Sequence, residues 1–400
     1  MIFPDSETPP GKLGADSPRE IFCCRSELPT IARWIKSRLS DGTADELGAD
    51  GIRAFEELLA KPFTLRVPLG HYLDDDDQVI AALTPQQFHI LDSVGHLNRV
   101  AAGGGAGTGK TILAMEDAVR LAQRGLRTAL ICYSEPLAAY MRKKLSKVVP
   151  SVGVWSLGAL CSALSQDAGY DCEATNDVER RIECLMKAVR AKPSLKFDAI
   201  VVDEAQDFRT HWWIAIEEAV KDHEASWLHA YFDTNQSVYG DLAKELAAFK
   251  IVPIHLTRNL RNTRNIHETA SRFYRGIPIT ADGPEGLTVE WLEVSSGEIH
   301  SSAVAAARRL IKEKVVPGEI VVLTAEEESG AVIRNRTGFP EGVEVSTIRN
   351  FKGLERKVII LATSRELADE AELAYVALSR ARTHLVVVGE KQILAWLKAH

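Results

Sequence analysis

The sequence predicts an α/β protein with parallel, doubly wound sheets, and three observations carry this prediction. From Leu83 onward, short apolar strands alternate with helical segments, which is the pattern of parallel strands joined by crossover helices. One strand runs into the glycine-rich segment Ala102–Thr111 (AGGGAGTGKT), and a later one within Ile200–Phe208 (IVVDEAQDF) ends on two carboxylates. In sheets of this kind, ligands bind at the carboxyl ends of the strands.

The elements follow in a regular order along the chain. Thr84 followed by Pro85 favours a helix start, because threonine can cap a helix and proline suits its first turn. The expected first sheet has strands at 99–102, 128–132, 153–156, 199–202 and 227–231, with helices at 85–94, 111–124, 136–148 and 212–220 and helical material at 157–192. The expected second sheet has strands at 288–292, 319–323, 343–347, 358–362 and 385–388, with helices at 302–314 and 372–382.

These elements divide the chain into four expected parts. They are a tail at 1–18, a small helical segment and acidic linker at 19–82, a first ATP-binding domain at 83–253 with a short helical insertion at about 158–195, and a second domain at 254–400. Helices are expected at 28–39 and 51–59 in the N-terminal segment. Because the glycine-rich segment Ala102–Thr111 has the G-x-x-x-x-G-K-[ST] spacing of a phosphate-binding loop, the architecture predicted is two tandem RecA-like P-loop NTPase domains with the ATP site between them.

Composition limits the classes of protein that fit. The 400 residues are 46% hydrophobic and 26% charged, which is ordinary for a soluble globular protein. The sequence contains no apolar run of about 18 residues, so no membrane span is predicted. The N-terminus lacks the layout of a signal peptide. The six cysteines show no metal-ligand spacing, so we expect reduced thiols in a cytoplasmic protein.

The net charge of −7 argues at first against a nucleic-acid partner. The acidic excess, however, lies in residues 1–82 and includes the run Asp74–Asp77, which we interpret as a solvated linker. The rest of the chain is close to neutral and carries basic clusters at 142–147, 258–264 and 349–357. Local basic clusters are sufficient for contacts to phosphate backbones, although such residues also occur simply as solvated helix faces.

The glycine-rich segment fits G-x-x-x-x-G-K-[ST], a phosphate-binding loop. Its backbone N–H groups converge on phosphate oxygens, its lysine supplies positive charge, and its threonine hydroxyl can bind Mg²⁺. The residues expected to bind the nucleotide are Gly104, Gly105, Ala106, Gly107, Thr108, Gly109, Lys110 and Thr111. The carboxylates Asp203 and Glu204 follow a later strand, and together the two motifs predict nucleoside triphosphate hydrolysis with ATP and Mg²⁺ as cofactors.

In seven stretches, residues 83–382 resemble the UvrD-like branch of superfamily 1 helicases. The stretches are LTPQQ at 83–87, the phosphate loop, DEAQDF at 203–208, FDTNQSVY at 232–239, NLR at 259–261, STIRNFKGLE at 346–355 and YVALSRAR at 375–382. The phrases TRNLRNTRNI, HWWIAIEEAV and GPEGLTVEW also resemble a subgroup fused to a nuclease-related (NERD) domain. Residues 19–82 are too short for that whole domain, so no nuclease activity is predicted.

The resemblance implies a role for each site residue. Gln87 would read adenine, Glu355 would contact the ribose, and Asp203 with Thr111 would hold Mg²⁺. The catalytic residues would be Glu204 as general base, Lys110, Gln236 and Arg261 at the γ-phosphate, and Arg380 as arginine finger. The plainer alternatives are helix capping around Gln87, a buried turn at Gln236, and charges placed at helix ends for Glu204 and Arg380.

Nucleic-acid contacts are expected from a smaller set of residues. By position in the family pattern these are Ser134, Trp155, Ser156, Thr347 and Arg349. Trp155 could stack on a base or be an interior aromatic residue at a strand end. Leu260 stands where the family has a tyrosine that stacks on adenine, which predicts weak base selectivity.

The predicted function is an ATP-dependent motor on single-stranded nucleic acid, with DNA as substrate and 3′–5′ movement as in the family. The slots for the family's two insertions are short, at about 158–195 and between Arg261 and Val343, so the sequence predicts hydrolysis and translocation but not processive unwinding. A second interpretation is therefore an ATP-gated regulatory subunit of a nuclease or other DNA-processing partner. A membrane partner is not expected.

Overall fold

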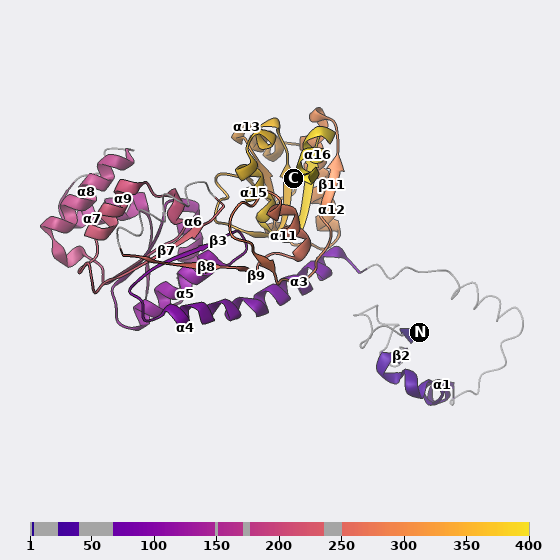
Figure 1. Ribbon diagram of the computed structural model, residues 1–400. Coiled ribbons are helices and arrows are strands. Elements are labelled where there is room, and N and C mark those ends of the chain that lie inside the picture. Colours follow the sequence, from indigo (N-terminus) through magenta and orange to yellow (C-terminus); the bar gives the residue numbers. More distant parts are fainter. Residues whose placement is uncertain are drawn as a thin grey trace, which may run out of the picture. The chain divides into compact units, whose positions relative to one another are not determined.

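The computed structural model describes residues 2–3, 23–39, 67–148, 151–170, 177–235 and 250–399. The chain forms two compact units, Met1–Arg66 and Val67–His400, shown in Figure 1. In the first unit, β1 (Ile2–Phe3) pairs in parallel with β2 (Cys23–Cys24), and η2 (Arg25–Thr30) leads into α1 (Ile31–Leu39). Most of the expected tail at 1–18 and the expected helix at 51–59 lie outside the described residues.

The second unit contains a six-stranded parallel sheet with the order β5-β4-β6-β7-β3-β8 among the described residues. The strands are β3 (Arg99–Gly104), β4 (Thr128–Cys132), β5 (Gly153–Ser156), β6 (Ala199–Val202), β7 (Trp227–Asp233) and β8 (Val252–Leu256). Strand β8 was not expected, and it extends the first sheet across the expected boundary at 253 and 254 by pairing with β3. We refer to residues 84–256 as the first lobe.

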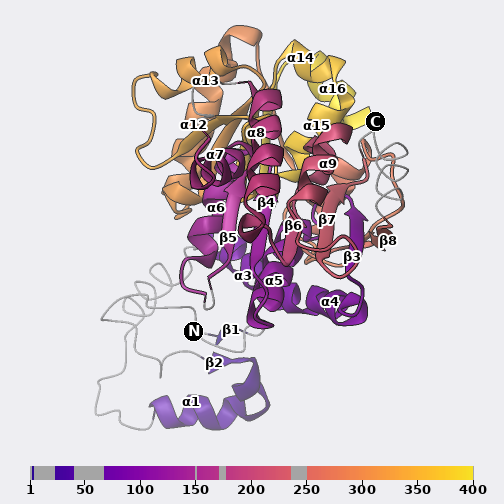
Figure 2. The ribbon, with the colours of Figure 1, turned by 90° about the vertical axis from the view of Figure 1, so that its left-hand side faces the viewer.

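Helices cover both faces of this sheet. The apolar side chains of α7 (Leu157–Asp167), α8 (Val178–Ala191) and α9 (Thr210–Glu218) form one core with one face, and Figure 2 shows these helices in front of the strands. Those of α4 (His89–Val94), α5 (Lys110–Gln123) and α6 (Glu135–Leu145) pack on the opposite face.

A second parallel sheet, in the second lobe (residues 258–399), has the order β11-β15-β14-β12-β13. Its strands are β11 (Glu290–Glu293), β12 (Ile320–Thr324), β13 (Glu344–Thr347), β14 (Arg356–Ala362) and β15 (Ala381–Gly389), and β9 (Arg258–Asn259) pairs separately with β10 (Thr280–Ala281). The helices are α11 (Arg264–Ser271), α12 (Ile299–Lys312), α13 (Glu327–Arg334), α14 (Arg365–Asp369), α15 (Ala371–Ser379) and α16 (Lys391–Ala399). The expected helix at 372–382 therefore ends at Ser379.

The two sheets confirm the predicted α/β class with tandem, parallel, doubly wound domains. In the second lobe, α12 and α13 cover one sheet face, whereas α11, α15 and α16 cover the other. The apolar residues of α11, α15 and α16 belong to the same continuous core as those of α5 and α6 in the first lobe. The two lobes therefore share one hydrophobic core.

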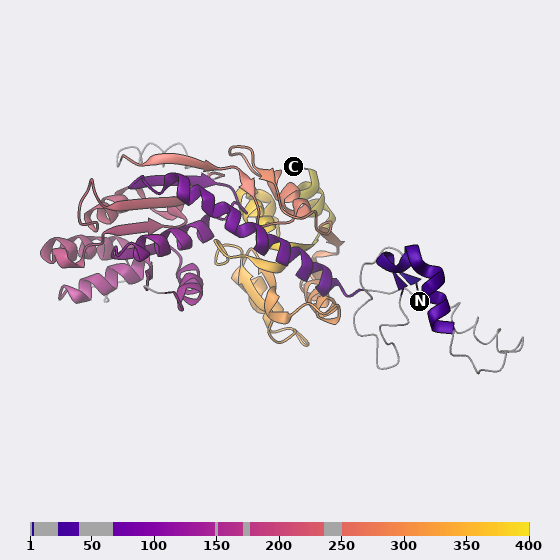
Figure 3. The same cartoon turned by 90° about the horizontal axis from the view of Figure 1, so that it is seen from below.

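The acidic run lies in a helix and not in the expected linker. Helix α3 (Leu69–Leu83) buries Leu73 in the core of the second lobe. The Lys357 ammonium bonds to Asp74 at 2.7 Å, and the Arg382 guanidinium bonds to Asp77 at 3.0 Å. Helix α3 continues through η3 (Thr84–Phe88) into α4, so that one rod extends from the second lobe to the first (Figure 3).

The cysteines differ in part from the expectation. Cys23, Cys24, Cys132 and Cys161 are free and buried, but Cys184 is disulfide-bonded, so the expectation of reduced thiols is wrong at this position. Within the described ranges, no three His, Cys, Asp or Glu residues form a group that could hold a metal ion. None of the described helices is both long and apolar enough to cross a membrane.

Candidate nucleotide site

A cleft between the two lobes brings most of the predicted nucleotide-site residues together. It has a volume of about 720 Å³, part of it open to solvent. The residues that line it are Ala106, Gly107, Gly109, Lys110, Thr111, Ile112, Tyr140, Glu204, Asp233, Asn235, Arg261, Lys352, Gly353, Glu355, Glu372, Tyr375, Val376 and Arg380. Residues more than 250 positions apart in sequence thus surround one space.

Two glycines of the phosphate loop occupy positions where a residue with a side chain would not fit. Gly107 and Gly109 have φ values of 74° and 79°, in the left-handed region that side chains disfavour. A Cβ atom at Gly107 would lie 2.1 Å from Asn262 Oδ1, and one at Gly109 would lie 2.1 Å from Gln87 Oε1. The loop is therefore packed between Gln87 of the first lobe and Asn262 of the second.

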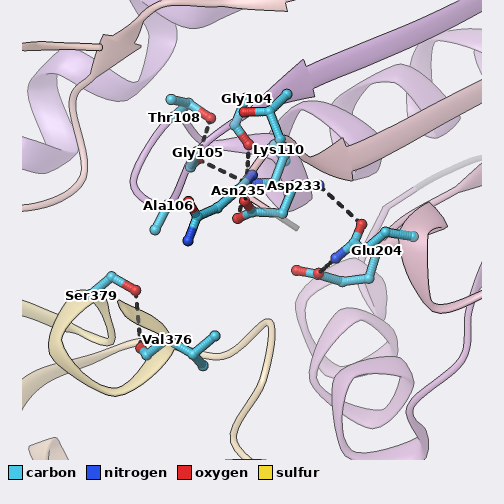
Figure 4. Close-up of polar contacts among 12 residues, drawn as sticks. Gly104, Gly105, Ala106, Thr108, Lys110, Glu204, Asp233, Asn235, Val376 and Ser379 are labelled. Carbon is cyan, nitrogen blue, oxygen red and sulfur yellow. Dashed lines mark hydrogen bonds and ion pairs between the residues drawn. The ribbon is translucent and has the colours of Figure 1, made fainter. Parts of the chain in front are cut away.

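Lys110 links the phosphate loop to the neighbouring strand. Its ammonium group donates to the carbonyl oxygens of Gly104 at 2.9 Å and Gly105 at 2.8 Å. It also pairs with the Asp233 carboxylate at 3.2 Å, and Figure 4 shows these groups converging on Lys110. Asp233 was not among the predicted site residues. Its position at the end of β7, the strand beside β3, is the signal that could have identified it.

The two adjacent carboxylates differ in environment. Asp203 is fully buried, and both of its carboxylate oxygens lack a hydrogen-bond partner within the described part of the chain. Burial, together with the charge of Glu204, raises the pKa of the Asp203 carboxyl to about 7, although the nearby Thr111 hydroxyl and Lys110 favour its charged form. A buried, unpartnered carboxylate beside a hydroxyl fits a hard divalent cation such as Mg²⁺, so Asp203 and Thr111 are the residues that could hold it.

Glu204 is held in an unusual conformation. Its φ of 51° places it in the left-handed region, which is costly for a residue with a side chain and which concentrates at functional sites. The Gln206 amide donates to the Glu204 carboxylate and accepts from the Asp233 backbone N–H at 3.0 Å. Gln206 therefore orients Glu204 at the edge of the cleft.

The second lobe contributes two arginines to the cleft. Arg261 donates to the Glu355 carboxylate at 3.0 Å and to the Thr84 hydroxyl at 3.2 Å. Burial raises the pKa of the Glu355 carboxyl. The positive charges of Arg261, Arg380 and Arg382 lower it by more, so the pKa is below its usual value. Arg380 donates to the carbonyl oxygens of Val376 at 3.0 Å and Leu354 at 3.3 Å.

Five of the predicted nucleotide-site residues do not line the cleft, namely Gln87, Gly104, Gly105, Thr108 and Asp203, and a sixth cannot be placed. Gln87 is buried, and its amide nitrogen donates to the Thr108 carbonyl oxygen at 3.0 Å. Thr108 is itself buried, with its hydroxyl bonded to the Gly105 carbonyl oxygen at 2.8 Å. Gln236 lies outside the described residues. Leu260, expected to face the base, is 1% exposed and does not line the cleft.

The predicted nucleic-acid residues do not form one cluster of available groups. The Ser134 and Ser156 hydroxyls cap α6 and α7, and Ser156 also bonds Glu135. Trp155 is half-buried against the core, with its indole nitrogen buried. The remaining two, in the second lobe, are Thr347, which is buried and accepts from the Asn350 N–H at 3.1 Å, and Arg349, which is exposed and pairs with Glu370 at 2.8 Å.

Comparison with known proteins gives one match at the level of a family. Residues 342–388 match the UvrD-like helicase C-terminal domain, and no curated protein sequence matches the chain.

Solved helicase structures are similar at low identity. The arterivirus nonstructural protein 10 helicase is 15% identical with a TM-score of 0.40, and the match covers 75% of this chain and 61% of that chain. The Pif1 helicase from Candida albicans is 12% identical with a TM-score of 0.43, and the match covers 78% and 98% of the two chains. The DUF1998 helicase MrfA, bound to DNA and AMPPNP, is 12% identical with a TM-score of 0.43, covering 83% and 54%. The chain is thus an α/β protein with two parallel sheets, and its residues 342–388 match the UvrD-like helicase C-terminal domain.

Proposed function

We propose that this protein hydrolyses ATP and uses the energy to move along nucleic acid, as a UvrD-like helicase or translocase. The cleft carries the proposal, because its wall combines the phosphate loop and Glu204 of the first lobe with Arg261 and Arg380 of the second. A site assembled from two lobes changes its geometry when they move, and this is how hydrolysis can be converted into motion.

Each residue of the cleft has a proposed part in hydrolysis. A bound Mg²⁺ would neutralise phosphate charge, held by Thr111 and Asp203. Glu204 orients the attacking water, and Lys110, Arg261 and Arg380 stabilise the charge that develops on the transferred phosphoryl group. Gln87 and Glu355 would contact adenine and ribose, although Glu355 must share its carboxylate with Arg261.

For the nucleic acid, we propose a single strand, with DNA as the substrate and 3′–5′ movement. The exposed Arg349 and the basic end of α6, Arg142 to Lys144, are suited to phosphate contacts. We also propose that the protein is related to the NERD-associated helicases, that it is located in the cytoplasm and that it acts in DNA repair. Four buried free thiols support a reducing compartment, whereas the disulfide at Cys184 does not.

Hydrolysis is tested by replacing Glu204 with glutamine in the full chain. The variant should bind ATP but hydrolyse it at least about 100-fold more slowly, because general-base assistance contributes on that order. Glu116→Gln is the matched control, since Glu116 pairs with Arg120 on the surface of α5 and does not line the cleft. Equal hydrolysis by wild type and Glu204→Gln would contradict the assignment.

A second candidate function is an ATP-gated regulatory subunit that does not unwind. It is favoured by α7 and α8, which fill the first insertion slot and pack against the sheet with α9 in one core. Because α7 and α8 pack against the sheet, they do not form a separate domain that could contact a nucleic-acid duplex. ATP-driven strand displacement or translocation would favour the motor, and nucleotide-dependent capture of a nuclease without movement would favour the regulator.

A further inference from the structure

The phosphate loop is bonded directly to the second lobe. The backbone N–H of Ala106 donates to the Tyr375 hydroxyl at 2.5 Å, and the Ala106 carbonyl oxygen accepts from the Asn259 amide at 3.2 Å. The next carbonyl group, that of Gly107, accepts from the Leu260 N–H at 3.2 Å. The tip of the loop is therefore tied to the second lobe through its main chain.

Tyr375 is held rigidly in this position. It is 4% exposed, and its ring stacks on Tyr274 with centroids 5.6 Å apart. The Tyr274 hydroxyl in turn lies 2.5 Å from the Thr234 hydroxyl of the first lobe. Burial raises the pKa of the Tyr375 hydroxyl well above its usual value, so the group stays neutral at physiological pH.

The group that Tyr375 holds, the Ala106 N–H, belongs to the proposed phosphate-binding loop. In a phosphate loop, successive backbone N–H groups donate to phosphate oxygens. Two acceptors cannot both take the hydrogen bond of Ala106 in good geometry, and a charged phosphate oxygen is a stronger acceptor than a neutral phenol. Given the proposed ATP site, we propose that the Tyr375 hydroxyl and a nucleotide phosphate compete for the Ala106 N–H, which makes Tyr375 a positioning residue that nucleotide binding displaces.

This competition links nucleotide binding to the position of Arg380. Tyr375 lies in α15, and Arg380 is the C-cap of the same helix. The Arg380 guanidinium donates to the carbonyl oxygen of Val376, the residue after Tyr375. Release of the Tyr375 hydroxyl from the loop therefore frees the helix that positions Arg380.

The test is the affinity of full-length Tyr375→Phe for a non-hydrolysable ATP analogue with Mg²⁺, measured by calorimetry without nucleic acid. The variant keeps the stacked ring and removes only the competing oxygen. We expect binding about three- to tenfold tighter than that of wild type, the value of one net hydrogen bond. Tyr133→Phe is the matched control, since Tyr133 stacks on Trp212 and does not line the cleft, and its affinity should change less than about twofold.

Thermal unfolding separates competition from a purely structural role. Without nucleotide, Tyr375→Phe should unfold at a lower temperature than wild type, because the Ala106 N–H loses its partner. With saturating analogue the difference should shrink, because the phosphate then satisfies that group in both proteins. An equal deficit in both conditions, or unchanged or weaker binding, would overturn the inference alone. Absence of nucleotide binding by wild type would overturn both the inference and the proposed function.

Discussion

The buried residue His229 lies between two groups that favour its charged form. Its Nδ1 lies 2.6 Å from an Asp117 carboxylate oxygen, and its Nε2 lies 3.0 Å from the Leu97 carbonyl oxygen. A carboxylate and a carbonyl oxygen at these distances match an imidazolium that donates from both ring nitrogens. The Tyr231 hydroxyl donates to the same carboxylate oxygen at 2.8 Å.

This arrangement predicts a pH dependence of stability. Burial, and to a smaller extent Arg124, lowers the pKa of His229, but Asp117 and the Leu97 carbonyl outweigh them and the net pKa is raised. A raised folded-state pKa stabilises the protein below the unfolded value of about 6.5, and this contribution is lost as pH rises through the folded value. Urea midpoints between pH 6 and 9 should fall more steeply for wild type than for His229→Gln. Parallel profiles would contradict the charged assignment.

Single residues also mark the limit of what the sequence could predict about the site. Lys110, Thr111, Asp203 and Glu204 lie in motifs whose chemistry depends on local spacing. Asp233, Tyr375 as a partner of the loop, and the Lys352–Asp207 pair at 2.6 Å depend on which distant segments meet. Sequence spacing does not contain that information.

At the scale of elements, most strands could be predicted because buried parallel strands are continuous apolar runs. Strand β8 (Val252–Leu256) was missed because it contains Pro253 and is only partly buried, as proline in a sheet is confined to edges. Helix α3 was missed because four consecutive aspartates suggest a solvated segment. Their partners, Lys357 and Arg382, lie about 300 residues later.

Helix α3 should stabilise the second lobe through these pairs. Lys357 is largely buried and bonds Asp74 and Glu319, whereas Arg382 bonds Asp77. The double substitution Asp74→Asn and Asp77→Asn should therefore lower the free energy of unfolding by about 1–2 kcal/mol, measured by urea denaturation at low salt. Asp75→Asn is the control, because Asp75 is exposed on the same helix. Equal stability of the double variant and the control would show that the pairs contribute nothing.

At the scale of the whole molecule, the two lobes make one site that neither holds alone. Arg380 lies in the second lobe and lines the same cleft as the phosphate loop. Arg380→Ala should therefore reduce the rate of hydrolysis by about 1000-fold or more, as expected for an arginine finger. Affinity for ADP, measured by calorimetry, should change much less, because the phosphate loop is intact. Loss of ADP binding with an unchanged rate per bound ATP would contradict this division of roles.

The central claim is that ATP hydrolysis serves movement on a single strand. The most direct measurement is the steady-state rate of ATP hydrolysis against the concentration of single-stranded DNA, with duplex DNA and RNA in parallel, at two defined salt concentrations. We predict a saturable increase of about tenfold or more with single strands, and an apparent affinity that falls as salt rises because phosphate contacts release counterions. A wild-type protein that binds ATP but hydrolyses it at the same rate with and without single strands would contradict the account.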